Sequence, residues 1–263
     1  MKVGVIGCGV MGNAMARRMA KKHEVALYSR SSVADLAQEI GAKACTSLKE
    51  VADHAEALVL AVKPHRLEEV AEELEPLMKQ ESLLLSVLGG ISLANLKEHF
   101  SRGVLFRVMP NLPLLCGKGM IGVAEDPQVA KEDQEKVNQV LEGMGTTVWL
   151  KEELMNPFTA LTGCNPAFIY LIIEAMVEAG ISMGIKQELA EDYVLKTIEG
   201  AVALFRDQGD SLQSLRWKIA SPGGSTIAGL QELEKERVRY ALMRGIQRAN
   251  EKSHESDLLK GEE

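Results

Sequence analysis

Three glycines near the start of the chain follow a pattern that can bind phosphate. A short apolar strand runs directly into Gly7-x-Gly9-x-x-Gly12. In such a unit the first glycine allows a tight turn, the second leaves room for a pyrophosphate, and the third lets a helix pack close to the strand. The N–H groups at the start of that helix point at the anion. We therefore expect Gly7, Gly9, Val10, Met11 and Gly12 to bind a dinucleotide.

The residues after the second predicted strand indicate which dinucleotide binds. An NAD site places Asp or Glu there to accept a hydrogen bond from the ribose 2′-hydroxyl. This chain has Ser29, Arg30 and Ser31 instead. A guanidinium and two hydroxyls suit a 2′-phosphate, which a carboxylate would repel. We expect NADPH to be preferred, with NADH possible. The alternative is that Arg30 simply points to solvent.

Two further loops follow predicted strands. Ligands of open α/β sheets bind at the carboxyl ends of strands, so Ala61, Val62, Lys63 and Pro64 could border the cofactor, although they could equally form a plain strand-to-helix turn. Asn111, between two prolines, could orient a ligand amide or close an Asx-turn.

A distinctive segment lies late in the chain, at Ser221-Pro222-Gly223-Gly224-Ser225-Thr226. A glycine pair before a helix start leaves a concave group of free N–H groups that suits a carboxylate. The alternative is an ordinary helix entry with Ser225 or Thr226 as the N-cap.

These candidates need a scaffold, and the first half of the chain alternates strands with helices. Such alternation predicts a doubly wound, mostly parallel α/β sheet of the Rossmann type over residues 1–150. No convincing strand follows, so we expect an all-helical domain over residues 151–263. The predicted strands are 3–6, 24–28, 57–62, 83–87, 104–108, 119–123 and 146–150. Ser31 or Ser32 can cap a helix that reaches residue 40, and residues 47–50 fit a capping box that begins a short helix. The other predicted helices are 11–22, 64–78, 93–99, 130–144, 158–183 with a break at 162–166, 189–208 and 227–250.

The helical half is apolar on all sides over residues 167–177. Such a helix must be buried, and a helical segment this small offers little core of its own. Burial in a homodimer is the favoured solution, with burial against the first domain as the alternative.

Composition limits the possible partners. The chain has 263 residues, 46% of them hydrophobic, and a net charge of −7. The acidic balance argues against nucleic acid or an anionic membrane as partner, and we identify no apolar run near the ~20 residues of a membrane span. The four cysteines are dispersed, which suits a reducing cytoplasm. The five histidines are scattered as well, so we expect no metal site.

Taken together, the motifs resemble the pyrroline-5-carboxylate reductase family over nearly the whole chain. The glycine loop, residues 61–64, Arg107-Val108-Met109-Pro110-Asn111 and residues 221–226 stand in that family's order and spacing. The resemblance implies NAD(P)H-dependent reduction of the C=N bond of 1-pyrroline-5-carboxylate to L-proline, by a homodimer that can assemble further. It also implies roles for single residues. Gly89 borders the cofactor and Glu152 lies near the substrate. Ser221 and the backbone of Gly224, Ser225 and Thr226 hold the substrate carboxylate, and the Thr226 hydroxyl lies at the imine nitrogen.

The chain departs from the family pattern at several positions. Asn156 stands where the family usually has Asp, and Thr162-Gly163-Cys164-Asn165 stands in place of Ser-Gly-Ser-Gly. Two alternatives therefore remain. One is a β-hydroxyacid dehydrogenase-like oxidoreductase, whose N-terminus is similar. The other is an NADPH-binding homologue that has lost catalysis.

Overall fold

The computed structural model describes residues 1–258, so the last five residues of the predicted helical domain lie outside the described residues. The chain packs as two compact units. The first is Met1–Gly163 together with the C-terminal turns from Asn250, and the second is Cys164–Ala249.

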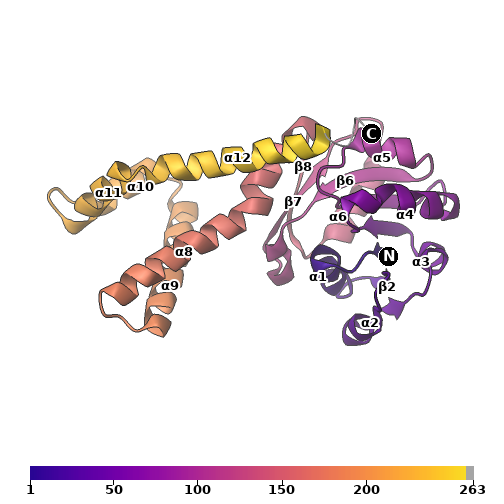
Figure 1. Cartoon of the computed structure of the whole chain (residues 1–263), viewed down its shortest axis with the longest axis horizontal. Coiled ribbons are helices and arrows are strands. Elements are labelled where there is room, and N and C mark those ends of the chain that lie inside the picture. The colour runs from indigo at the N-terminus through magenta and orange to yellow at the C-terminus, as the bar shows by residue number, and fades with distance from the viewer. Residues whose placement is uncertain (259–263) are drawn as a thin grey trace. The chain divides into compact units, whose positions relative to one another are not determined.

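An eight-stranded sheet forms the centre of the first unit (Figure 1). Its strand order is β3-β2-β1-β4-β5-β6-β7-β8, and only the β6–β7 pair is antiparallel. The mostly parallel, doubly wound sheet expected from the sequence is confirmed. The strands are β1 (Lys2–Ile6), β2 (Glu24–Tyr28), β3 (Lys43–Ala44), β4 (Ala57–Leu60), β5 (Leu83–Ser86), β6 (Val104–Met109), β7 (Gly119–Ala124) and β8 (Gly145–Leu150).

Helices cover both faces of this sheet. Successive strand residues point to opposite sides, and because both sets are apolar, each face packs against helices. Val59 packs on one face with α1 (Val10–Met19), α2 (Ala34–Ile40) and α6 (Lys131–Leu141). Leu58 packs on the other face with α3 (Leu48–His54), α4 (Leu67–Leu74) and α5 (Leu93–His99). The central strands are therefore buried on both sides and hold the site rigidly.

The order in which successive strands join the sheet reverses beside β1. Ile6, the last residue of β1, pairs with Tyr28 of β2 on one side and with Leu60 of β4 on the other. Strands β2 and β4 then lead to opposite edges of the sheet. A crevice opens at the carboxyl ends of strands where the order reverses in this way. The residues that follow β1, β2 and β4 therefore meet at one place.

The second half is helical, as expected, but its helices differ from the prediction. The break expected at residues 162–166 is instead a π-helical turn, Ala160–Cys164, that joins α7 (Met155–Thr159) to α8 (Asn165–Ser182). The helix expected over 227–250 is divided at Arg237, which has a φ of 58°. The other helices are α9 (Gln187–Gln208), α10 (Leu212–Ile219), α11 (Ser225–Lys235) and α12 (Val238–Leu258).

The π turn produces one continuous helical stretch, Glu152–Ser182, of 31 residues. Its most apolar 18-residue window has a mean hydropathy of 1.5 and is only 6% buried in this chain. By length and composition it could cross a membrane, so the expectation of no apolar run near that length was wrong. We expected a break at residues 162–166 because Gly163 and Pro166 disfavour a continuous helix, and so we counted the apolar residues on either side of it separately. A helix that packs against a second protein chain has the same composition.

Candidate active site

Two of the three loop glycines are required by the packing of the loop. Gly7 has a φ of 94°, and a Cβ on it would lie 2.7 Å from the carbonyl oxygen of Ala61. A Cβ on Gly12 would lie 1.9 Å from the carbonyl oxygen of Gly7. A Cβ on Gly9 would meet nothing within 4 Å. Gly9 is therefore not needed for packing, and the space above it is available to a ligand.

The start of α1 leaves N–H groups beside this space. Gly9 is the N-cap of α1 and has no side chain to cap it. The first-turn N–H groups, at Val10, Met11 and Gly12, have no carbonyl within the helix to bond to. Val10 is 77% exposed. The loop thus combines an open cradle with free donors at the positive end of a helix, as a pyrophosphate requires.

The end of β2 borders a cavity beside the glycine loop. The cavity measures about 230 Å³ and is lined by Gly7, Ser29, Arg30 and Val62, among others. The sequence therefore identified these four residues, which the fold brings together here from the ends of β1, β2 and β4. Ser31 lies next in the chain and is exposed.

The same cavity contains charged residues that the sequence reasoning missed. Arg66, Glu69 and Glu73 line it from the turn Pro64–Arg66 and from α4. Two of them are acids, so the site is not free of carboxylates, although none follows β2 directly. The available signal was Pro64, which begins a helical turn at the end of β4 and turns the next residues back toward the strand ends.

The other cofactor candidates lie at the carboxyl ends of β4 and β5. Ala61 follows β4 directly, and its N–H donates to the carbonyl of Ile6 across 2.8 Å. Lys63 is exposed, and Pro64 opens the next turn. Gly89 follows β5 in a loop where an added Cβ would meet nothing within 4 Å. All of these residues follow the carboxyl ends of strands, the same end of the sheet at which the glycine loop lies.

Glu152 lies in a buried cluster around Arg107. The Arg107 side chain is 3% exposed; its Nη1 lies 3.2 Å from Oε1 of Glu152, and its Nη2 donates to Oδ1 of Asn156 across 3.0 Å. The same Glu152 oxygen accepts a hydrogen bond from the backbone N–H of Leu93, at the start of α5, across 2.5 Å. One oxygen of this carboxylate, Oε1, therefore already accepts from two donors.

Asn111 takes neither of its expected roles. Its Nδ2 donates to the carbonyl of Thr162 across 2.9 Å, and its Oδ1 accepts from the N–H of Met120 across 2.8 Å. The side chain is buried and both of its ends are used, so it bridges β7 and the π turn.

The segment Ser221–Thr226 belongs to the second unit. Gly224, rather than Ser225 or Thr226, is the N-cap of α11, and no side chain caps the helix. Its own N–H already donates to the carbonyl of Ser221 across 3.1 Å. The N–H groups of Ser225 and Thr226 have no intrahelical acceptor. Within residues 1–258 the hydroxyls of Ser221, Ser225 and Thr226 have no hydrogen-bond partner, so this helix start offers both N–H and O–H donors.

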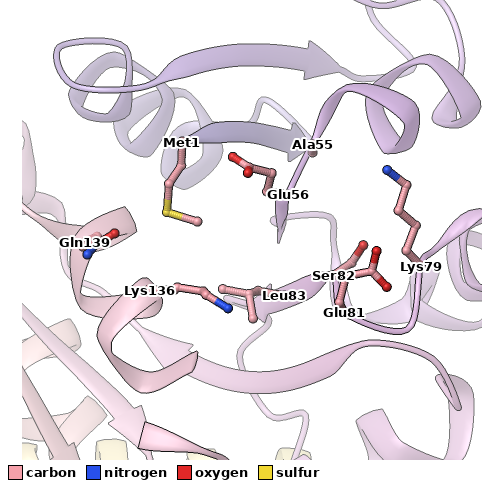
Figure 2. A pocket seen from close by; sticks show the side chains of 9 residues that line it. All are labelled: Met1, Ala55, Glu56, Lys79, Glu81, Ser82, Leu83, Lys136 and Gln139. Atoms are coloured by element: carbon pink, nitrogen blue, oxygen red, sulfur yellow. The ribbon is translucent and has the colours of Figure 1, made fainter. Parts of the chain in front are cut away.

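A second cavity of about 480 Å³ lies at the other end of the sheet (Figure 2). Met1 and Glu56 precede β1 and β4, and Ser82 precedes β5, so this cavity opens at the amino ends of the strands. Cofactors of open α/β sheets bind at the opposite ends. We therefore do not assign it to the cofactor.

The Rossmann sheet, the glycine loop and the cavity after β2 define the class: a dinucleotide-dependent oxidoreductase with a helical second unit. Two family models match this division. One, for pyrroline-5-carboxylate reductase dimerisation, matches residues 152–256, and one for NADP oxidoreductase, coenzyme F420-dependent, matches residues 2–90. The chain belongs to the pyrroline-5-carboxylate reductase family, because it also matches individual members along its full length.

Three relatives illustrate this match. The pyrroline-5-carboxylate reductase of Corynebacterium melassecola is 32% identical, covering 96% of this chain and 97% of the relative. The crystal structure of the Plasmodium falciparum pyrroline carboxylate reductase with NADP bound is 33% identical, with a TM-score of 0.90, covering 98% of both chains. The Streptococcus pyogenes 1-pyrroline-5-carboxylate reductase structure is 29% identical, with a TM-score of 0.88, covering 96% of this chain and 98% of that one. A Mycobacterium tuberculosis 3-hydroxyisobutyrate dehydrogenase structure, with 14% identity and a TM-score of 0.53, shares the fold alone.

Proposed function

We propose that the protein is a pyrroline-5-carboxylate reductase that uses NADPH to reduce the C=N bond of 1-pyrroline-5-carboxylate to L-proline, a step of proline biosynthesis. One observation carries this: members of that name match the chain from end to end at about 30% identity. The Plasmodium relative was solved with NADP bound.

The residues of the first unit fit the cofactor. The open space at Gly9 and the free N–H groups of Val10 and Met11 would hold the pyrophosphate. Ser29, Arg30 and Ser31 would meet the adenosine ribose and its 2′-phosphate. Ala61, Val62, Lys63, Pro64 and Gly89, at the ends of β4 and β5, would border the remainder of the dinucleotide.

The start of α11 fits a carboxylate. The N–H groups of Ser225 and Thr226 and the Ser221 hydroxyl would hold the carboxylate of the substrate. The Gly224 N–H is engaged with Ser221, so the role of Gly224 is to keep side-chain atoms out of this space. A Cβ there would lie 2.5 Å from the Ser221 hydroxyl oxygen.

The chemistry needs positioning more than a strong acid. When bound, the nicotinamide supplies the hydride that the imine carbon accepts. The Thr226 hydroxyl would donate a hydrogen bond to the imine nitrogen, which would orient the ring and could pass on the proton that this nitrogen gains. This accounts for a site in which we identify no catalytic His–Asp pair from the sequence. Glu152 acts near the substrate by fixing Arg107 and the start of α5.

Assembly follows from the apolar surface of the second unit. Large apolar side chains lie exposed along α8 and α9, including Tyr170, Leu171, Tyr193 and Phe205. The family model that matches here describes dimerisation, so a homodimer explains how these residues are buried, and a membrane is not required. We extend the proposal to further assembly of dimers and to a cytoplasmic location, which the four free cysteines support.

The direct test is an NADPH-consumption assay with the purified protein. With 1-pyrroline-5-carboxylate we expect NADPH oxidation matched by L-proline formation, and no oxidation with β-hydroxyacids and NADP. Turnover of a hydroxyacid without turnover of the imine would favour the dehydrogenase alternative. Tight NADPH binding without turnover of any cyclic imine would favour the catalytically silent alternative.

A further inference from the structure

Arg66 is the most buried of the charged residues that line the cavity beside the end of β2. Its side chain is 13% exposed, although it follows the exposed residues Lys63 and His65. It lines the 230 Å³ cavity together with Ser29 and Arg30. A guanidinium in this position faces the space next to the glycine loop rather than open solvent.

A single partner holds Arg66 in place. Its Nε donates to Oε2 of Glu69 across 3.0 Å, and its Nη2 donates to Oε1 across 2.5 Å. This is the bidentate geometry that a guanidinium uses for carboxylates and phosphates. Its Nη1 has no hydrogen-bond partner among residues 1–258, so part of the donor fork remains available to a ligand.

The partner, Glu69, is much more exposed than Arg66. The Glu69 side chain is 65% exposed and lies on the first turns of α4. The Arg66 guanidinium holds the pKa of Glu69 below its usual value, and the charge of Arg30 adds to this effect. Arg30, Arg66 and Glu69 line the same cavity, so both arginines lie near one carboxylate. A dianionic phosphate can replace that carboxylate as their common partner.

We propose that Arg66 is a second residue that determines cofactor specificity, binding the 2′-phosphate of NADPH together with Arg30. Glu69 orients Arg66 before the phosphate arrives and competes with the phosphate for it. This inference rests on the proposed function, because it requires that the first unit binds NADPH. It differs from the sequence prediction, which placed this specificity on residues 29–31 alone.

The test is binding of 2′,5′-ADP and of 5′-AMP, measured by calorimetry at low salt. The two probes differ only by the 2′-phosphate, and neither requires turnover. For Arg66→Ala we expect about 10- to 100-fold weaker binding of 2′,5′-ADP, as for a lost charge-assisted hydrogen bond, with 5′-AMP within about twofold. For Arg66→Lys we expect an intermediate loss, because lysine keeps the charge but not the fork.

Glu69→Gln has a matched control in its exposed neighbour, Glu68→Gln, which removes the same charge outside the cavity. We expect tighter binding of 2′,5′-ADP in the first variant and no change in the second. Equal losses for both probes in Arg66→Ala, or no loss for either, would overturn the role of Arg66. Unchanged or weaker binding in Glu69→Gln would overturn the competition. A wild-type protein that binds neither probe would overturn the proposed cofactor itself, and this inference with it.

Discussion

The side-chain amide of Asn111 donates a hydrogen bond to the backbone carbonyl of Thr162 across 2.9 Å. In a regular α-helix that carbonyl would accept from the N–H four residues later, but residue 166 is proline and has none. Asn111 therefore gives this carbonyl a side-chain donor where the α-helical donor is absent, and it ties the loop after β6 to the π turn.

Asn111→Ala should therefore destabilise the fold. It leaves the half-buried N–H of Met120 and the carbonyl of Thr162 without this partner. We expect a loss of about 2–4 kcal/mol in the free energy of unfolding, measured by urea denaturation. Pro166→Ala restores a backbone N–H, so the double variant should lose less than the sum of the single variants. A single Asn111→Ala variant as stable as the wild type would contradict this role.

Gly9→Ala and Gly12→Ala form a matched pair in the glycine loop. A Cβ at Gly12 overlaps the Gly7 carbonyl, whereas one at Gly9 meets no protein atom within 4 Å. We expect Gly12→Ala to lose about 2 kcal/mol or more of stability. Gly9→Ala should melt within a few degrees of the wild type but bind NADPH at least ~10-fold more weakly, because the methyl group occupies the space of the pyrophosphate. Thermal melts and fluorescence titration with NADPH separate the two effects. Normal NADPH affinity in Gly9→Ala would place the pyrophosphate elsewhere.

Glu152→Gln tests whether this residue acts on the substrate directly or through Arg107. Removing the carboxylate leaves a buried guanidinium without its ion-pair partner. Because Glu152 is about one-third exposed, we expect a loss of only about 1–2 kcal/mol in unfolding free energy. The exposed neighbour, Glu153→Gln, is the control and should lose almost none. Unchanged stability in Glu152→Gln, with a large increase in the KM for the imine, would instead favour direct contact with the substrate.

Cys8 lies within the glycine loop, and burial raises the pKa of its thiol to about 11. The neutral thiol is therefore favoured in the folded protein, and at pH 8 only about one thiol in a thousand is ionised. We expect alkylation of Cys8 by iodoacetamide to be slow at pH 8 and to accelerate about tenfold per pH unit toward pH 11. The exposed Cys116 should react first, as peptide mass spectrometry can show. Reaction of Cys8 at the rate of Cys116 at pH 8 would contradict this expectation.

Much of the first unit could be predicted from the sequence because its strands are short, apolar and followed by turn residues. Strand β4 was predicted to reach Val62 but ends at Leu60, since apolar residues continue past the last ladder pair. The two-residue strand β3 is too short to carry a pattern, and α10 has only eight residues, between loops.

The side-chain contacts of the site were harder to predict. Gly7, Gly9 and Gly12 could be predicted because they form a recognisable pattern within the short turn between β1 and α1, where Gly7 and Gly12 are needed for packing and Gly9 leaves open space. The pairing of Arg66 with Glu69 is also local, but its place beside Arg30 depends on how β2 and β4 lie on either side of β1. The contact between Arg107 and Glu152 joins residues 45 positions apart, which no local pattern specifies.

The measurement that tests the central claim most directly is the kcat for NADPH-dependent reduction of 1-pyrroline-5-carboxylate by the wild type, Thr226→Ser and Thr226→Ala. If the Thr226 hydroxyl orients or protonates the imine nitrogen, kcat should fall about 10- to 100-fold in Thr226→Ala. Thr226→Ser retains the hydroxyl and should keep most of the activity. A wild type that does not reduce the imine would contradict the proposed function, and an unchanged kcat in Thr226→Ala would remove this residue from the chemistry.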